Sequence, residues 1–288
     1  MKKILTSLIG NTQKLDGGAM FGNAPKTLWS KWMRSDEYNK INLACRALLI
    51  EDNQKLILLE TGIGAFFEPK LKERYGVVES EHVLLNSLKE HGLSHRDIDV
   101  VIFSHLHFDH AGGVLSAWDE NESCELLFTK AKFLVGKAAW ERAVHPHSRD
   151  KASFVPVLNE LLQRSNRLII VDSEKSTLLG NDYHFYFSDG HTPGMMHTEV
   201  KGEGASCFFA ADLIPGINWI HLPITMGYDR FPEKLIDEKK SILEHAVKDN
   251  VKIFYTHDPE IALSDINCDA NGKYNAINPV EKLNKFVL

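Results

Sequence analysis

The sequence predicts an α+β fold in which two mixed β-sheets pack face to face and helices cover the outside. Pairs of apolar segments joined by short polar turns are typical of β-hairpins. They are mixed along the chain with segments whose apolar residues recur at helical spacing. The chain has 288 residues, 43% of them hydrophobic, which is enough to bury a large core. We therefore expect one domain that spans residues 1–288.

The amino-terminal part of the chain begins with an apolar segment, residues 1–10, that Thr6 and Ser7 interrupt. No small-residue cleavage site follows it, so we expect a first strand rather than a signal peptide. The glycines and the proline of residues 16–29 then predict an ordered loop. The apolar side chains of residues 19–32 would wall a substrate pocket, contact a second copy of the chain, or be held by ordinary packing.

Later elements follow from the same patterns of apolar residues. We expect a hairpin over 44–60, a helix over 81–90 that Gly92 ends, and strand 100–103. After these come strand 131–135, a helix from residue 137, strands 168–171 and 183–187, a hairpin turning at 201–204, a helix over 233–248 and strand 251–255. The tail from Asp265 onward is polar and turn-rich, with no sign of a second core.

Composition excludes several classes of function. The formal net charge of −6 and the lack of basic runs with interleaved aromatic residues disfavour nucleic acid as a partner. No stretch approaches the length of a membrane span. The four cysteines are scattered without a Cys-x-x-Cys motif, so neither a disulfide framework nor a structural zinc knuckle is expected. We expect a cytoplasmic protein.

The most informative stretch is residues 104–113, Ser-His-Leu-His-Phe-Asp-His-Ala-Gly-Gly. It places three histidines and a carboxylate within six positions, directly after an apolar strand. Neutral imidazole and carboxylate are ligand types that suit zinc, iron, manganese or cobalt. Gly112 and Gly113 let the backbone turn tightly beneath the site.

The same pattern recurs along the chain, because His105, His191, Asp212 and His257 each follow the end of an apolar strand. Loops held by rigid strands are where function is usually placed, so we expect these side chains to form one site. His145 and His147 lack a carboxylate neighbour and are expected in a plain surface loop. We expect packing or surface positions for five further histidines, His82, His91, His95, His184 and His245. His197 is assigned mainly a structural role.

These residues resemble the metallo-β-lactamase superfamily, whose fold is a four-layer αβ/βα sandwich. The resemblance covers nearly the whole chain, from the hairpin near residue 45 through His257. It implies two divalent metal ions, with zinc as the first expectation and iron, manganese or cobalt as alternatives. It assigns His105, His107 and His191 to the first ion, Asp109, His110 and His257 to the second, and a bridging role to Asp212.

Within the superfamily, the chain resembles the N-acyl homoserine lactonase branch and, with it, the organophosphate (methyl parathion) hydrolases. The similarity lies in residues 16–22, 191–197, 211–216 and 221–229. True β-lactamases lack the bridging aspartate, and sulfur dioxygenases use a single iron, so both activities are disfavoured. Many lactonases carry a tyrosine where this chain has Pro215, and many carry a histidine where it has Met195.

The function that this resemblance implies is opening of lactone rings, with N-acyl homoserine lactones first, by attack of a metal-bridging hydroxide. Asp109 would be both a metal ligand and a proton shuttle. His221 and Tyr228 would donate hydrogen bonds to a substrate oxygen in place of the missing tyrosine, or merely satisfy local backbone groups. A homodimer is expected from the apolar segment 19–32 and from the family.

The alternative function is hydrolysis of organophosphates or aryl esters at the same metal site. A glyoxalase II type of thioesterase is less favoured because the chain after His257 is too short and polar for that family's substrate-binding helices. Superfamily nucleases are disfavoured by the charge and by the absence of their extra domain. A non-enzymatic metal-binding or redox-partner module would show a missing ligand or an added flavin domain, and neither is seen.

Overall fold

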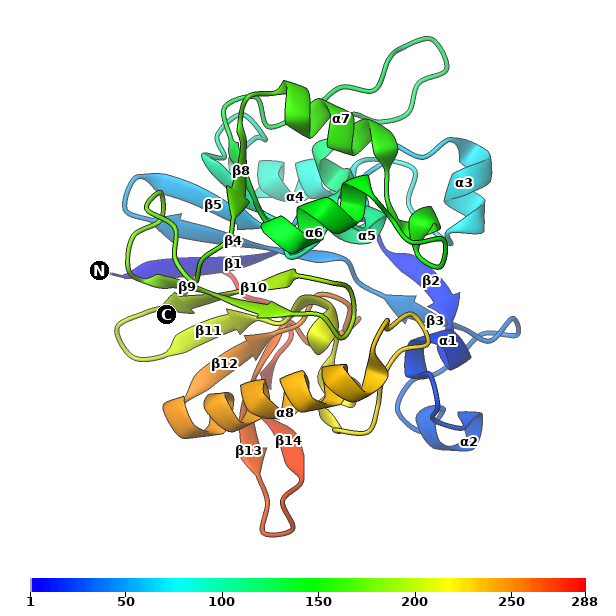
Figure 1. Ribbon diagram of the computed structural model, residues 1–288, viewed down its shortest axis with the longest axis vertical. Coiled ribbons are helices and arrows are strands. Elements are labelled where there is room, and N and C mark those ends of the chain that lie inside the picture. Colours follow the sequence, from blue (N-terminus) through cyan, green and yellow to red (C-terminus); the bar gives the residue numbers. More distant parts are fainter. Residues whose placement is uncertain (1) are drawn as a thin grey trace.

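Two β-sheets face each other in the computed structural model, which describes residues 2–288 (Figure 1). The first sheet has the strand order β15 (Phe286–Val287), β1 (Lys3–Ile9), β4 (Arg46–Asp52), β5 (Lys55–Leu59), β6 (Val100–Ile102), β7 (Lys132–Gly136) and β8 (Leu168–Val171). The second has the order β14 (Tyr274–Val280), β13 (Leu263–Cys268), β12 (Val251–Phe254), β11 (Ser206–Phe209), β10 (Met195–Lys201) and β9 (Tyr183–Ser188). A short antiparallel pair, β2 (Gln13–Asp16) and β3 (Lys40–Leu43), stands apart from both.

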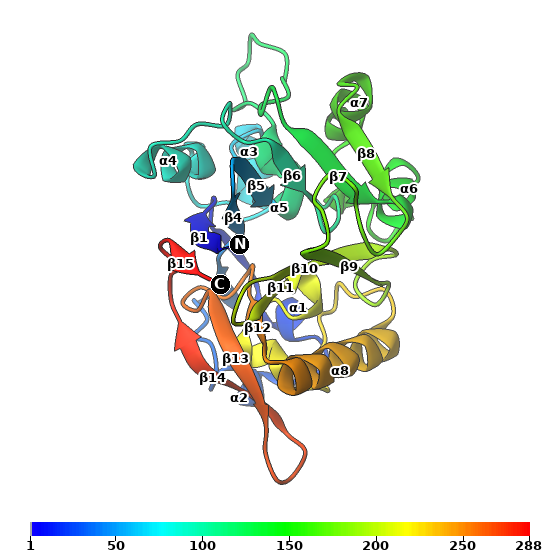
Figure 2. The same ribbon diagram turned by 90° about the vertical axis from the view of Figure 1, so that its left-hand side faces the viewer.

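Helices cover the outer faces of the two sheets, so the molecule has four layers (Figure 2). The helices are α1 (Gly17–Phe21), α2 (Lys26–Trp29), α3 (Pro69–Arg74), α4 (Val83–Glu90), α5 (Phe108–Ala111), α6 (Lys137–Val144), α7 (Pro156–Arg164) and α8 (Pro232–Asp249). Helices α4, α6 and α7 pack on the first sheet, and α8 packs on the second. The predicted α+β sandwich is confirmed.

The central strands of the first sheet, such as β4 and β6, are buried on both faces because two hydrophobic layers enclose them. In β4, Leu48 and Ile50 point into the core between the sheets, whereas Ala47 and Leu49 point toward the helices. This alternation follows from the two-residue period of a strand. Burial of each such Leu or Ile side chain contributes about 1.5–3 kcal/mol, so the sandwich gives the site a rigid frame.

Most of the predicted elements are confirmed, and the polar carboxyl-terminal tail, which forms no second core, contains strands that the sequence analysis did not predict. Strands β13 and β14 extend the second sheet, and β15 returns to pair with β1 at Ile4 and Leu5. The sequence signal was weak because β14 is an edge strand with mostly half-buried or exposed side chains. The small pair β2 and β3 was also not predicted.

The apolar segment 19–32 packs against its own chain. The ring of Phe21 stacks on Trp29 and on Trp219, with ring centroids 5.6 and 4.6 Å apart. Phe21 and Trp29 are almost completely buried, and Met20 lines the pocket described below. This packing confirms that the segment is ordered, while Leu28 remains 37% exposed, and the homodimer stays a prediction.

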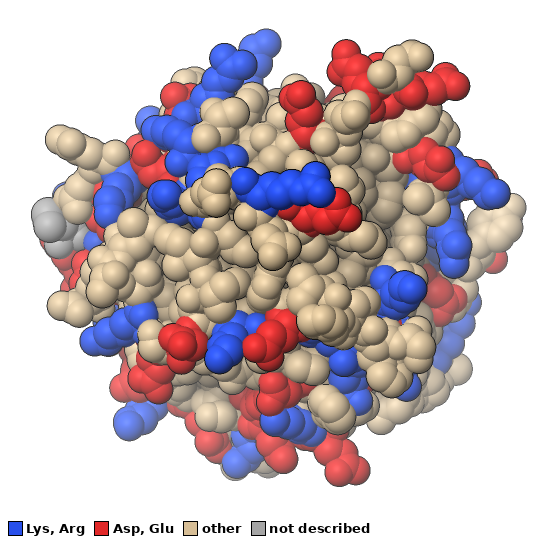
Figure 3. Space-filling model, turned by 45° about the horizontal axis from the view of Figure 1, so that its top comes forward, with Lys and Arg blue, Asp and Glu red and all other residues tan. Residues whose placement is uncertain are grey.

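The surface carries no extended area of one charge on the face shown in Figure 3, where basic and acidic side chains are interspersed. Within residues 2–288, no helix has both the length and the apolar character needed to cross a bilayer.

Gly113 is expected to tolerate no side chain. Gly112–Val114 form a 3-10 turn directly after α5, and a Cβ atom at Gly113 would lie 2.1 Å from the carbonyl oxygen of Thr61. Neither Gly112 nor Gly113 has a positive φ, so close backbone approach, not conformational freedom, is the reason for glycine here. We expect Gly113→Ala to lower the free energy of unfolding by about 1–3 kcal/mol in a denaturant titration.

The matched control for this prediction is Gly204→Ala, because a Cβ atom at Gly204 would have no neighbour within 4 Å. Equal stability of the two variants would contradict the close approach.

Candidate metal centre and substrate pocket

The predicted site residues come together where strands of both sheets end. His105 follows β6, His191 follows β9, Asp212 follows β11 and His257 follows β12. His107, Asp109 and His110 continue from His105 into α5. Both sheets therefore contribute side chains to one cluster, as expected from the positions of these residues after strands.

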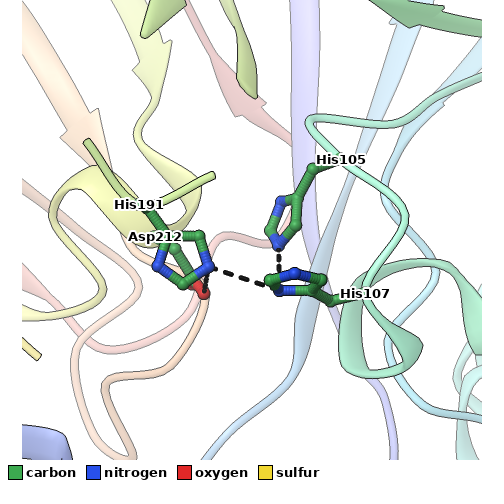
Figure 4. A group of neighbouring side chains, drawn as sticks. All are labelled: His105, His107, His191 and Asp212. Carbon is green, nitrogen blue, oxygen red and sulfur yellow. Dashed lines mark hydrogen bonds and ion pairs between the residues drawn. The ribbon is translucent and has the colours of Figure 1, made fainter. Parts of the chain in front are cut away.

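One half of the cluster contains His105, His107, His191 and Asp212, whose ligand-type atoms lie within 4.8 Å of one another (Figure 4). His107 Nδ1 lies 2.9 Å from His105 Nε2 and 3.3 Å from His191 Nε2. His191 Nε2 in turn lies 3.1 Å from Asp212 Oδ2.

The other half contains Asp109, His110 and His257. His257 Nε2 lies 3.2 Å from His110 Nε2. The Asp109 carboxylate lies 3.7 Å from His257 Nε2 and 3.8 Å from His110 Nε2.

Asp212 lies between the two halves and turns one oxygen toward each. Its Oδ2 faces His191, whereas its Oδ1 lies 3.0 Å from His257 Nε2 and 3.3 Å from His110 Nε2. Ala211, the preceding residue, has a φ of 46°, a left-handed conformation that is costly for a residue with a side chain. The backbone is thus strained at the residue that directly precedes Asp212, whose carboxylate faces both groups of histidines.

Hydrogen bonds on the far side of the rings orient the four histidines that present Nε2. His110 Nδ1 donates to Glu60 Oε2 at 2.8 Å, His191 Nδ1 donates to Asp229 Oδ1 at 2.9 Å, and His257 Nδ1 donates to the Ala44 carbonyl at 2.7 Å. His105 Nδ1 donates to Ser104 Oγ at 2.9 Å. A proton on Nδ1 leaves the Nε2 lone pair free, which is the arrangement found in metal-binding histidines.

Glu60 and Asp229 are site residues that sequence reasoning missed. Glu60 is fully buried, has a φ of 61°, and also accepts a hydrogen bond from the Ser104 hydroxyl. Asp229 is 1% exposed and its second oxygen accepts from the Met226 amide at 2.6 Å. Glu60 directly follows β5 and Asp229 is the last residue of segment 221–229, but these positions do not show which histidine each of them contacts.

These residues fit a pair of divalent cations. His110 and His257 both donate from Nδ1, so their Nε2 lone pairs face each other at 3.2 Å and need a positive charge between them. Asp212 Oδ1 is buried and makes no hydrogen bond, although two imidazole nitrogens approach it. Tetrahedral zinc, with bonds of about 2.0–2.1 Å, holds its ligand atoms about 3.3 Å apart, close to the separations seen in both halves.

Comparison with known proteins agrees with this geometry. The sequence pattern of the Metallo-beta-lactamase superfamily matches residues 42–257. The chain belongs to this superfamily.

Relatives in sequence and in structure indicate which branch of the superfamily the chain resembles. N-acyl homoserine lactonase of Bacillus thuringiensis is 25% identical over 234 residues, which cover 76% of this chain and 83% of the lactonase. A probable metal-dependent hydrolase of Staphylococcus aureus has a similar structure, with a TM-score of 0.83 and 26% identity over 96% of this chain and 98% of the hydrolase. AidC, a dizinc quorum-quenching lactonase solved with a product, has a TM-score of 0.74 and 23% identity over 95% and 93% of the two chains. The resemblance to the N-acyl homoserine lactonase branch is confirmed, and this superfamily member is a metal-dependent hydrolase.

Burial and charge set the protonation of the metal-free cluster. Burial lowers the pKa of His105 and His107 well below its usual value, so both rings are neutral. Burial alone would also lower the pKa of His110, but the negative charges of Glu60 and Asp212 raise it well above the usual value. His257 shows the same balance, in which Asp212 raises the pKa against the effect of burial. The cluster therefore attracts positive charge, which bound metal ions would supply in place of protons.

A pocket of about 330 Å³ opens onto the cluster. The ligand-type residues that line it are His107, Asp109, His191, Asp212 and His257. Its apolar wall consists of Leu15, Met20, Leu43, Phe108 and Met226, with Tyr75 and Tyr228 beside them. This size and lining are typical of small-molecule sites.

Tyr228 and His221 lie in different places. Tyr228 lines the pocket, and burial together with the charges of Asp16 and Asp109 raises the pKa of its phenol, which stays a hydrogen-bond donor at neutral pH. His221 does not line this pocket. It lies in a separate surface groove with Lys273, and its ring faces Trp32. The expectation that His221 acts on the substrate therefore gains no support.

Several of the other histidines occupy positions that agree with the structural roles predicted for them. His145 and His147 are exposed, as expected for a surface loop. His82 is buried and bonds to the Gly113 carbonyl at 3.0 Å, so it supports the turn beneath the motif. His197 is buried against Phe208 and bonds to Ser188 Oγ at 2.8 Å. Pro215, at the position of the missing tyrosine, accepts two backbone hydrogen bonds from His257 and Asp258.

Proposed function

We propose that the protein opens lactone rings, with N-acyl homoserine lactones as the first candidates, at a centre of two divalent metal ions. The observation that carries this proposal is the position of Asp212, which turns one carboxylate oxygen toward each of two histidine groups. Lactonases among the relatives in sequence supply the choice of substrate.

The chain would hold each ion with its own set of side chains. His105, His107 and His191 hold the first, Asp109, His110 and His257 hold the second, and Asp212 belongs to both. Bound ions of this kind lower the pKa of water toward 7 and polarise an ester carbonyl. Zinc fits this mixture of imidazole and carboxylate, which iron, manganese and cobalt also accept.

Asp109 and Tyr228 are the side chains that act on the reacting groups. Asp109 lines the pocket with its carboxylate 15% exposed, so it can take a proton from the attacking water and deliver it to the ring oxygen as the C–O bond breaks. Tyr228 lies on the same pocket and donates its phenolic hydrogen to the lactone carbonyl oxygen. The apolar wall, which includes Met20 and Phe108, receives the acyl chain.

The test of this function is acid release from N-hexanoyl-L-homoserine lactone by protein reconstituted with zinc, manganese or cobalt. An aryl ester and a phosphotriester are assayed in parallel. The proposal is supported if the lactone is hydrolysed with a higher kcat/KM than the aryl ester and the phosphotriester. Cleavage of the phosphotriester or aryl ester without lactone opening would agree with a hydrolytic metal centre. It would indicate that the chain hydrolyses organophosphates or esters instead of lactones.

Tyr228→Phe is expected to lower kcat/KM for the lactone by about three- to tenfold, because one neutral hydrogen bond to the substrate oxygen is lost. Tyr38→Phe is the matched control, since Tyr38 is 74% exposed and does not line the pocket. Unchanged kinetics in both variants would remove Tyr228 from the reaction.

A further inference from the structure

Three arginines line the pocket beside the metal centre. They are Arg74 at the end of α3, Arg149 in the segment after α6, and Arg230 in the segment that enters α8. These parts of the chain all lie on the right-hand side of Figure 1. Three elements that are distant in sequence thus bring cationic groups to one cavity.

Within residues 2–288, none of the three arginines forms an ion pair with a carboxylate. Arg74 lies with its guanidinium 5.8 Å from the centre of the Tyr75 ring. Arg149 donates to the Gly227 carbonyl at 3.1 Å. Arg230 donates to the Tyr228 carbonyl from Nε and from one terminal nitrogen, whereas its Nη1 is buried and has no hydrogen-bond partner.

The one other acidic residue on the pocket wall, besides Asp109 and Asp212, does not balance these charges. Asp150 is 4% exposed and is bound by Arg142, whose Nε and Nη2 both donate to Oδ2 at 2.9 and 2.8 Å. Asp109 and Asp212 face the imidazole groups of the metal centre. The charges of Asp150 and Asp229 act on Arg230 from nearby, but Asp150 is paired with Arg142 and Asp229 with His191. The three arginines therefore have no carboxylate of their own in an ion pair.

An arginine that lacks a carboxylate in the protein is a ready partner for one in a ligand, because its donors form a planar fork that matches a carboxylate. Metal ions held by the neighbouring cluster would add to the positive potential of the cavity. A buried donor without a hydrogen-bond partner, such as Arg230 Nη1, costs free energy in the unliganded protein.

We infer that the natural substrate carries a carboxylate on the part of the molecule that is remote from the scissile ester, and that Arg149 and Arg230 bind it. This inference rests on the proposed function, whose reaction it leaves unchanged. The apolar wall then surrounds the middle of the substrate, between a reacting ester at the metal centre and an anionic end at the arginines.

The test compares two ligands of equal chain length, N-pentanoyl-L-homoserine lactone and the same lactone with a terminal carboxylate, N-(4-carboxybutanoyl)-L-homoserine lactone. Their hydrolysis is measured as kcat/KM. Binding is measured by calorimetry with the corresponding lactams, which resist ring opening. We expect the carboxylated lactam to bind at least about tenfold more tightly, and the preference to shrink with added salt.

Arg149→Gln, Arg230→Gln and their combination are expected to reduce this preference toward unity. Arg164→Gln removes a charge from the exposed face of α7 and serves as the control that keeps the preference. Arg230→Lys, which keeps the charge but not the fork, is expected to restore part of it. Thermal unfolding and metal content of each variant show that the centre is intact, and Arg149→Gln alone suffices if Arg230→Gln does not fold.

The lactam measurement separates this inference from the proposed function. A preference for the carboxylated lactam that falls in the arginine variants supports the inference even if no lactone is opened. Equal affinity for both lactams, no binding of either, or a preference that all the arginine variants retain would overturn it, even in an efficient lactonase.

Discussion

Asp212→Asn is expected to lower lactone opening by about 100-fold or more. Substitution of a residue that only hydrogen-bonds to a metal ligand reduces metal affinity or activity by about 10–100-fold. We expect a larger effect at Asp212, because it is placed to contact both ions itself. The substitution keeps the shape of the side chain but removes the charge that His110, His191 and His257 face. The measurement is kcat/KM together with metal content by atomic emission.

Asp237→Asn is the matched control for this prediction, since Asp237 is exposed on α8. We expect the control to keep its metal and its activity. An Asp212→Asn protein with two bound ions and full activity would contradict the role of Asp212 as the shared ligand.

Glu60→Gln is expected to weaken metal binding by about 10–100-fold and to lower the free energy of unfolding by about 1–3 kcal/mol. The carboxylate of Glu60 accepts hydrogen bonds from both His110 and Ser104. A glutamine amide offers one acceptor and one donor, so one of these two buried donors would face an N–H group. Competition with a chelator measures the metal affinity, and a denaturant titration measures the stability.

Glu90→Gln, at the exposed end of α4, is the control for the loss of one surface carboxylate. If Glu60→Gln changed stability without changing metal affinity, Glu60 would be a packing residue and not a support of His110.

The sequence was most informative where local chemistry and local structure coincide. Each candidate ligand follows a strand of strongly apolar residues, and such strands are recognisable without tertiary information. The order of the strands in the two sheets then brings His105, His191, Asp212 and His257 to one place. The fold and the meeting of these four side chains could therefore be predicted together.

The supporting residues could not be predicted in the same way, because their roles depend on contacts over long sequence distances. Glu60 meets His110 across 50 positions, and Asp229 meets His191 across 38. His221 follows Asp212 closely in sequence, yet it lies in another groove. The pocket arginines come from three separate segments, and none of them lies in a recognisable motif.

Zinc titration of the metal-free protein, with acid release from N-hexanoyl-L-homoserine lactone as the readout, is the decisive test of a dinuclear centre that opens lactones. The seven candidate ligands, Asp212 among them, predict that activity rises until two equivalents of zinc are bound per chain and then stays constant. Full activity at one equivalent would contradict the dinuclear centre, and no acid release at any zinc level would contradict lactone opening.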